Sequence, residues 1–302
     1  IEVNNHLRLE GKNTKSELIM ALPGETKETF IKGLNNILNS NISSVTIYTL
    51  MMLYGTEFKN PEYRDKFKYK GKFRIVPLNF GEYAGKKVMD CEEVGIENKD
   101  LSFEDYLYIR VLALLVETLH NGKPFYEFFK YARKFNIQPA SLLGVLYKNI
   151  SNSPQNLQKI IKNFVKETNN ELWDTEQSLI NHYKIDKNYL KLKNGEVGGN
   201  LIFKYKSKNL VEAGLDWVNY LEKQIFKLAT SKEVNTDSTK IIKSELSEIA
   251  SFCRLKINAL LDAKIETRPV EGEFNYDILK WLEDENENKR LSEYKFLENK
   301  KN

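Results

Sequence analysis

The sequence predicts a mixed chain, with an α/β portion in residues 1–100 and a mainly α-helical domain in residues 101–302. Two patterns support this prediction. A strand, a turn, a helix and a second strand follow one another between Ser16 and Leu53, and a series of capped helices begins at Ser102. Parallel strands need a crossover helix of the kind that the first pattern supplies. We therefore expect the first two strands to be parallel.

The first strand is predicted from an apolar run, Leu18 to Leu22, which Pro23-Gly24 ends in a turn. Thr26 is expected to cap the next helix, because a threonine hydroxyl can accept hydrogen bonds from first-turn amides. Apolar residues then recur at helical spacing, which gives this helix one apolar face. They are Phe30, Leu34, Ile37 and Leu38. The second strand is expected from Val45 to Leu50.

The connection after the second strand has no clear period. Residues 73–97 contain a short apolar run and three glycines, so we expect a long loop here. Long loops in compact domains are often functional. Because it follows the second strand, this loop is interpreted as facing a substrate.

The clearest helix is predicted from Ser102 to His120. Ser102 and Asp105 have the spacing of a capping box, and Asn121-Gly122 is a typical helix end. Further helices are expected at 124–135, at 139–150, after Ser153-Pro154, at about 210–230 and at about 238–263. Asn194-Gly195, between two alternating stretches, predicts a β-hairpin near 190–206.

The composition excludes several classes of protein. Lysine and arginine (46) and aspartate and glutamate (42) are interleaved and leave a net charge of +4, which does not favour nucleic-acid binding. The two cysteines are too far apart in sequence to indicate a disulfide framework, and they fit a reducing cytoplasm. No uncharged apolar stretch reaches the roughly 18 residues of a transmembrane helix, so no membrane span is expected.

The segment SELIMALPGETKETF, Ser16 to Phe30, resembles the fifth-strand signature of radical S-adenosylmethionine enzymes, especially their cobalamin-dependent group. Ile47 to Glu57 is similar to the family's sixth strand, including its Gly-Thr-Glu ending. A third similarity runs from Arg74 to Tyr106, and the resemblance as a whole extends from Ile1 to Ile150. It implies that the α/β portion is a partial parallel β/α barrel, of which only the last strands are present.

The resemblance also implies cofactors: S-adenosylmethionine, a 4Fe-4S cluster and cobalamin, with an electron donor for the cluster and a small-molecule substrate. Methyl transfer to an unactivated carbon is the commonest reaction of that group. The family holds its cluster with three cysteines at CxxxCxxC spacing, whereas this chain has only Cys91 and Cys253. We therefore expect a C-terminal portion of a longer enzyme, inactive by itself.

By resemblance, the S-adenosylmethionine pocket would include six residues of the first two strands and the turn between them. Ala21 stands where the family has glycine. Glu25 also has a purely structural interpretation, because a carboxylate near a helix N-terminus stabilises the helix, and core packing is the alternative for the two residues on the second strand. The six residues are Ile19, Ala21, Gly24, Glu25, Tyr48 and Thr49.

Cys91, Glu92 and Glu93 are candidates for the substrate side. The alternatives are a solvated acidic loop and, for the cysteine, a small buried apolar residue. The three histidines, His6, His120 and His182, share no metal-ligand spacing, so no metal site is expected in this chain. The competing functional hypothesis is a non-catalytic helical binding or scaffold module that retains a degenerate α/β remnant.

Overall fold

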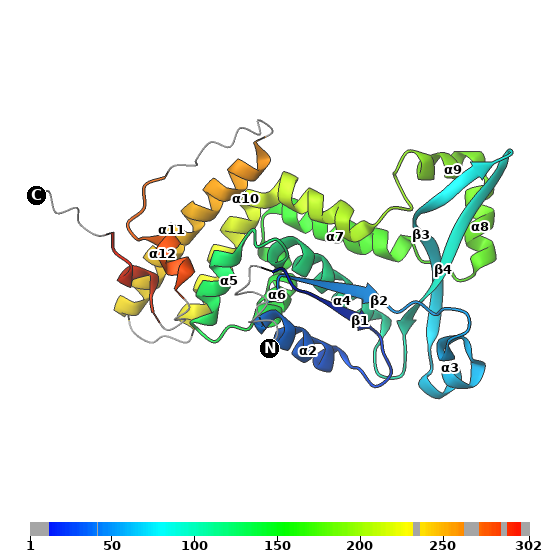
Figure 1. Ribbon diagram of the computed structural model, residues 1–302, viewed down its shortest axis with the longest axis horizontal. Coiled ribbons are helices and arrows are strands. Elements are labelled where there is room, and N and C mark those ends of the chain that lie inside the picture. The colour runs from blue at the N-terminus through cyan, green and yellow to red at the C-terminus, as the bar shows by residue number, and fades with distance from the viewer. Residues whose placement is uncertain (1–11, 41, 232–235, 263–271, 285–288, 297–302) are drawn as a thin grey trace, which may run out of the picture. The chain divides into compact units, whose positions relative to one another are not determined.

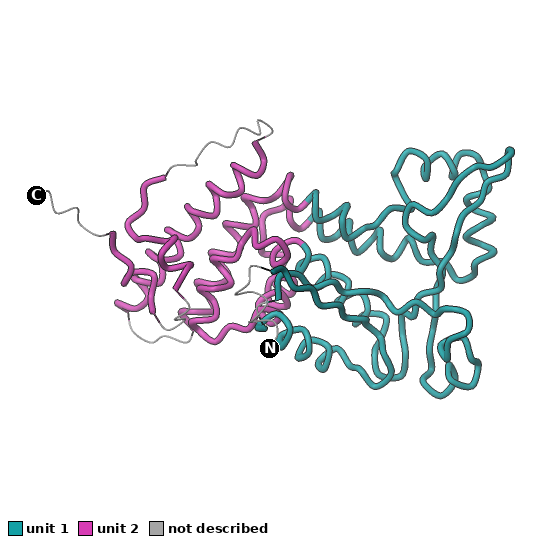
Figure 2. The backbone as a smooth tube through the Cα atoms, viewed as in Figure 1, with its two compact units in different colours: residues 1–117, 159–208 teal, residues 118–158, 209–302 magenta. Residues whose placement is uncertain are grey.

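The computed structural model describes residues 12–40, 42–231, 236–262, 272–284 and 289–296. Within these ranges the chain is mixed α/β and largely helical, with two small sheets of two strands each (Figure 1). It divides into two compact units (Figure 2). Unit 1 comprises Ile1–Glu117 and Lys159–Lys208, and unit 2 comprises Thr118–Gln158 and Asn209–Asn302. The predicted boundary near residue 100 is therefore wrong, because residues 101–117 and 159–208 belong with the α/β portion.

In unit 1, the predicted strand–helix–strand element is confirmed. Strands β1 (Lys15–Met20) and β2 (Ser44–Thr49) are parallel, and helix α2 (Lys27–Asn39) connects them. Thr26 caps α2, its hydroxyl accepting a hydrogen bond from the Thr29 amide at 3.3 Å.

The two faces of this sheet differ in burial. Met20 of β1 and Thr49 of β2, which are paired in the register, turn to the buried face. The neighbouring pair, Ile19 and Tyr48, is 45% and 47% exposed on the opposite face. Side chains alternate along strands, so one face of the sheet is covered and the other is open.

Residues 73–97 are not the predicted loop. They lie in an antiparallel hairpin of β3 (Lys70–Tyr83) and β4 (Lys86–Glu97). Ala84 and Gly85, with φ of 47° and 75°, form its two-residue loop, and positive φ at both positions is the mark of a type I′ turn. A register shift between Ile75 and Phe80 interrupts the alternation, which is why the period was not visible in the sequence.

The remaining elements of unit 1 are helical. The predicted helix from Ser102 is confirmed, with a capping box formed by Ser102 and Asp105, and it continues into a π-helical turn, Val116–His120. The helices are α3 (Pro61–Phe67), α4 (Phe103–Leu115), α7 (Gln155–Asn170, mostly in this unit), α8 (Glu176–Lys184), α9 (Asp186–Lys193) and the first turns of α10 (Leu201–Thr230).

The predicted β-hairpin near 190–206 is also wrong, because Asn194 and Gly195 end helix α9 instead. The Gly195 amide donates to the Leu192 carbonyl and the Glu196 amide to the Lys191 carbonyl, both at 3.0 Å. This is the Schellman pattern, which needs the positive φ of 70° found at Gly195. The next segment begins α10 instead of a strand.

In unit 2 every described element is helical, and the predicted helices are confirmed with shifted ends. Residue 263, the predicted end of the last long helix, lies outside the described residues. The α-helices are α5 (Tyr126–Arg133), α6 (Pro139–Lys148), the greater part of α10, α11 (Thr236–Leu261) and α12 (Ile278–Glu283), and two short 3-10 helices lie at Ile150–Asn152 and Leu291–Glu293.

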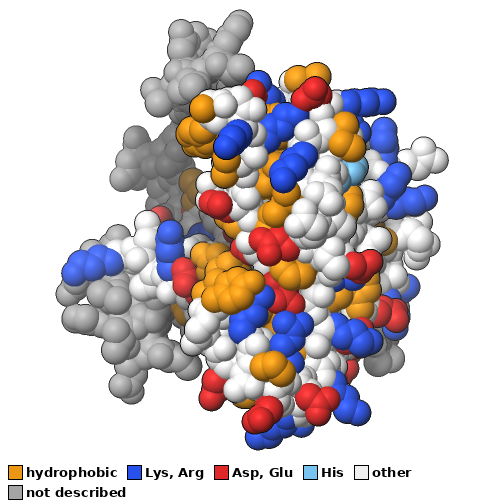
Figure 3. Space-filling view, turned by 90° about the vertical axis from the view of Figure 1, so that its right-hand side faces the viewer, with side chains coloured by type: hydrophobic (Ala, Val, Ile, Leu, Met, Phe, Trp, Pro, Cys, Tyr) orange, Lys and Arg blue, Asp and Glu red, His pale blue; other side chains and the backbone are white. Residues whose placement is uncertain are grey.

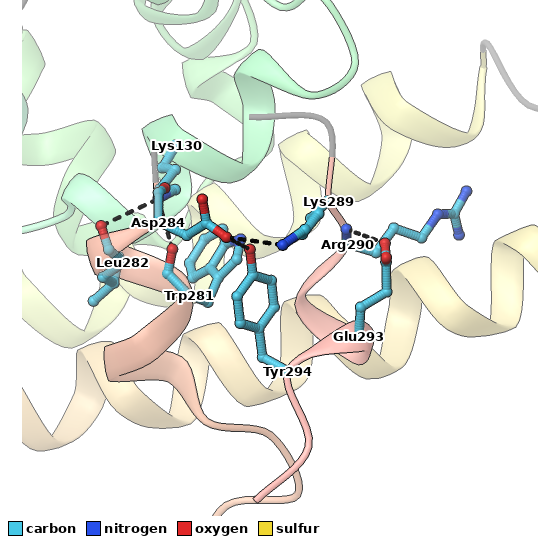
Figure 4. A network of polar contacts seen from close by, with 8 residues as sticks. All are labelled: Lys130, Trp281, Leu282, Asp284, Lys289, Arg290, Glu293 and Tyr294. Carbon is cyan, nitrogen blue, oxygen red and sulfur yellow. Dashed lines mark hydrogen bonds and ion pairs between the residues drawn. The ribbon is translucent and has the colours of Figure 1, made fainter. Parts of the chain in front are cut away.

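Lys130 of α5 fixes the C-terminal end of α12 (Figure 4). The Lys130 ammonium is buried and donates to the carbonyls of Trp281 (2.6 Å), Leu282 (3.1 Å) and Asp284 (2.6 Å). The last carbonyls of a helix have no partner within it, and a cation at that end is also favoured by the helix dipole. Lys130 thus supplies the cap that so short a helix needs.

Candidate functional site

The candidate site lies at the carboxyl end of β1, where the chain turns into α2. The Glu25 amide donates to the Leu22 carbonyl at 3.2 Å, which closes a turn around Pro23 and Gly24. Gly24 has φ of 78°. Proline followed by a residue with positive φ is typical of a type II turn, and this turn directs the helix away from the sheet edge.

Ala21 is fully buried and has φ of 67°, in the left-handed region. This conformation is costly for alanine and easy for glycine, the residue that the family resemblance places here. The Ala21 carbonyl accepts hydrogen bonds from the Tyr69 hydroxyl (2.8 Å) and the Asn98 amide (3.0 Å). These two buried side chains hold the strained residue in place.

The turn is also attached to the segment that follows β4. The Gly24 amide donates to the Asp100 carboxylate at 3.1 Å. Lys27, at the start of α2, forms an ion pair with Asp105 of α4 at 2.6 Å. Four anchors on residues 69–105 therefore fix the backbone from 21 to 27 before any ligand arrives.

Among the described residues, two of the candidates, Thr49 and Glu25, have a buried side-chain oxygen with no hydrogen-bond partner, and of these two Glu25 lies on the turn. Within the part of the chain that the structure describes, its Oε2 atom is buried without a hydrogen-bond partner. Burial raises the pKa of the Glu25 carboxyl above its ordinary value. A buried, unpaired carboxylate oxygen is unfavourable, so this site would be stabilised by a cationic or hydrogen-bond-donating ligand.

The other predicted pocket residues separate into two groups. Ile19 and Tyr48 lie side by side on the open face of the sheet, where a flat apolar group could rest. Thr49 lies on the opposite, buried face beside Tyr106 of α4. Thr49 is therefore apart from the open-face residues.

Strand β4 places the three substrate-side candidates in different surroundings. Cys91 packs, half-buried, against an apolar cluster that includes Ile75 and Leu192, and burial raises the pKa of its thiol to about 11. Glu92 pairs with Arg74 at 2.6 Å. Glu93 is buried between two cations, Lys59 and Arg64.

Glu93 forms ion pairs with Lys59 and with Arg64 (2.9 Å to Arg64). Burial alone would raise the pKa of the Glu93 carboxyl, but hydrogen bonds from Arg64 and Lys59 outweigh it and lower that pKa. Gly71, on the paired strand, leaves the space that the carboxylate fills. This environment stabilises a permanent carboxylate and does not suit a group that exchanges protons near neutral pH.

A second polar cluster, which the sequence analysis missed, lies beside β2. It joins Arg74 of β3 and Arg110 of α4 to Glu171, and Arg110 is only 5% exposed. The sequence carried one signal for it, since Arg110 directly precedes the apolar run Val111 to Val116 in the middle of a buried helix. A charge in that position is rare unless it has a structural or binding role.

The described residues contain no group of three or more His, Cys, Asp or Glu side chains that could hold a metal ion. His182 packs against Trp173, His120 lies in the π-helical turn after α4, and His6 is outside the described residues. Within the same ranges, no helix is both long and apolar enough to cross a bilayer.

Acidic and basic side chains are mixed over the side of unit 1 where β3 and β4 lie (Figure 3). Apolar side chains form small separate groups among them on this side. That face therefore offers no continuous basic surface for a polyanion. Neither a protein-family model nor a curated protein sequence matches the chain.

Proposed function

We propose that this chain carries the last strands of the partial β/α barrel of a cobalamin-dependent radical S-adenosylmethionine enzyme. In this proposal the chain supplies one side of the S-adenosylmethionine pocket and the substrate side. Methyl transfer to an unactivated carbon is the reaction that the resemblance favours.

One observation carries the proposal. The position at which the resembling family has glycine is the position at which the backbone turns left-handed, with φ of 67° at Ala21. Glycine adopts a positive φ without strain, so this backbone conformation would account for the glycine that the family has at this position. The apolar pattern that suggested the family does not involve this conformation, so the two observations are independent. The site also lies at the carboxyl end of parallel strands, where α/β folds bind ligands.

The chain's own residues fit part of S-adenosylmethionine. Glu25 would accept a hydrogen bond from the α-ammonium group, which supplies the donor that its buried Oε2 lacks among the described residues. Ile19 and Tyr48 would support the adenine on the open face of the sheet. Bound at the cluster, S-adenosylmethionine would supply the radical. The chain does not fit the cluster itself, because it has two cysteines and the cluster needs three.

The first test is the coding sequence upstream of Ile1. The proposal expects a CxxxCxxC loop within one domain length of that residue. An upstream sequence without such a loop would contradict the enzyme assignment and favour the non-catalytic binding or scaffold module.

The second test is S-adenosylmethionine binding by the chain, measured by isothermal titration calorimetry. Glu25→Gln is expected to weaken binding by about 10-fold or more, because a hydrogen bond between charged groups contributes about 1.5–3 kcal/mol. Glu28→Gln is the matched control, since Glu28 is exposed in the first turn of α2. Equal affinities for the wild type and Glu25→Gln would remove Glu25 from the pocket.

A further inference from the structure

A cavity of about 390 Å³ lies beside β2, entirely within unit 1. Its size is within the range of about 300–1,000 Å³ that is usual for small-molecule sites. Five successive residues of β2, 45–49, line it. Successive side chains of a strand point to opposite faces of the sheet. A cavity that contacts five residues in a row must therefore lie along the edge of β2. Among the described strands β2 pairs only with β1, and the cavity lies along the other edge.

The wall opposite β2 is formed by β3, α4 and the start of α10. It combines apolar surface, from residues such as Pro77 and Phe203, with charged groups of both signs. The first turn of α10 contributes residues 201–203, and helix N-termini favour anions. The charged lining residues are Lys15, Arg74, Arg110, Glu117 and Glu171.

Most of these charges already have close partners. Arg74 binds Glu92 at 2.6 Å and Glu171 at 3.1 Å. Glu117 pairs with Lys206 at 2.7 Å. The closest cation to each carboxylate of the cavity, among the described residues, is therefore a residue other than Arg110.

Of the remaining two charges, Lys15 is exposed, whereas Arg110 is buried, has no carboxylate within hydrogen-bond distance among the described residues and lies over the Phe164 ring, 5.9 Å from its centroid. Arg110 is 5% exposed, and its single ion pair among the described residues is to Glu171 at 3.9 Å, beyond hydrogen-bond distance. Its Nε atom is buried with no hydrogen-bond partner in the same residues. A buried guanidinium is costly unless carboxylate or phosphate oxygens satisfy its donors.

We propose that this cavity binds a small organic anion whose carboxylate or phosphate group pairs with the Arg110 guanidinium. The first turn of α10 would add favourable electrostatics, and the apolar lining would hold the body of the molecule. Arg110 and Arg74 also act on the neighbouring Tyr106: burial raises the pKa of its hydroxyl, and the two guanidinium groups oppose that rise. The positive potential of these two guanidinium groups therefore extends to the Tyr106 hydroxyl at this end of the cavity. The inference does not depend on the proposed radical chemistry.

The test titrates the 302-residue chain with inorganic phosphate and, separately, with benzoate, at constant ionic strength, by calorimetry. At least one probe is expected to bind the wild type saturably and to raise its Tm. Binding by phosphate alone would identify a phosphate ligand, and binding by benzoate alone a carboxylate. Arg110→Met is expected to weaken the binding at least about 10-fold, as expected for loss of a charge-assisted pair.

Two further variants keep the test decisive. Arg254→Met makes the same charge change at a half-exposed residue of unit 2 and should bind like the wild type. Ala113→Leu leaves Arg110 intact but fills the cavity, and it should lose binding even if Arg110→Met does not fold. The proposal is overturned if neither probe binds the wild type, or if Arg110→Met or Ala113→Leu, once folded, binds as tightly as the wild type.

Discussion

Replacing Glu93 by alanine should destabilise the β3–β4 hairpin, whether or not Glu93 takes part in a reaction. The Glu93 side chain is 5% exposed, whereas its partners Lys59 and Arg64 are 18% and 28% exposed. Removing one member of a buried ion pair costs about 3–5 kcal/mol. We expect the lower end, about 3 kcal/mol, because both stranded cations lie close enough to the surface to reach water.

Hydrogen exchange of the β3–β4 amides, read by mass spectrometry, would measure this local loss of stability. Because the folded pKa of Glu93 is lowered, its contribution is complete above the ordinary glutamate value of 4.5 and is lost as the pH falls through the lowered pKa. The difference between wild type and Glu93→Ala should thus be constant near neutral pH and shrink in acid.

A double-mutant cycle with Gly71 gives the sharpest test of this geometry. A Cβ atom on residue 71 would overlap with Glu93 Oε1, so Gly71→Ala must displace the carboxylate from its cations. In the Glu93→Ala background the obstructing atoms are gone, and the same change should cost at least about 1 kcal/mol less. Additive costs would refute the inferred contact, and a pH-independent effect of Glu93→Ala would refute the ion pairs.

Three further predictions concern other parts of the chain. Ala84→Asn should stabilise the hairpin by about 0.5 kcal/mol, because Asn before Gly85 suits the type I′ turn, and urea unfolding would measure it. Lys130→Met should cost about 3 kcal/mol, seen as faster exchange of α12 amides, through loss of its charge-assisted hydrogen bonds, whereas Lys280→Met at an exposed site should not. Burial raises the pKa of Glu25 in the folded protein, so the protonated carboxyl stabilises the fold in acid and the wild type loses this stability as the pH rises. Thermal melts should therefore give Glu25→Gln a higher Tm than the wild type at pH 7 and an equal Tm in acid.

The elements that the sequence predicted well are those with local signals. Thr26, and Ser102 with Asp105, accept or exchange hydrogen bonds within four residues, so their role follows from the residue types alone. Gly122, with φ of 75°, ends a helical segment in the same local way. The parallel pairing of β1 and β2 followed as well, since the crossover helix between them leaves little choice.

The β3–β4 hairpin had no such signal. Its loop uses Ala84 where asparagine is usual, and Pro77 and Leu78 sit inside the strand at an irregularity. The Leu78 amide donates to the Gly198 carbonyl at 2.9 Å, so a residue far along the chain supports that irregularity. Local propensity could not reveal a strand that is completed by tertiary contacts.

The prediction of a β-hairpin at Asn194-Gly195 was wrong for a different reason. The dipeptide supplies a positive φ, which both a hairpin turn and a helix end can use. The packing of Leu192 favours the helix end. Leu192 is buried against Ile75 and Met89, whereas Leu190 is 54% exposed. Those two partners belong to the hairpin that was itself missed, so the second error depended on the first.

The candidate sites share a property that sequence patterns reveal only in part. At Ala21 the backbone holds a non-glycine residue in a conformation that costs roughly 1–2 kcal/mol. At Arg110 a guanidinium lies buried with its nearest carboxylate partner at 3.9 Å. Both costs fall around the same β1–β2 sheet, one at its carboxyl end and one beside its free edge. Strained or poorly satisfied groups persist mainly where binding or catalysis requires them. If a ligand relieves either cost, its binding should stabilise unit 1 most strongly at this sheet. Amide hydrogen exchange should then slow more in β1 and β2 than in the rest of unit 1.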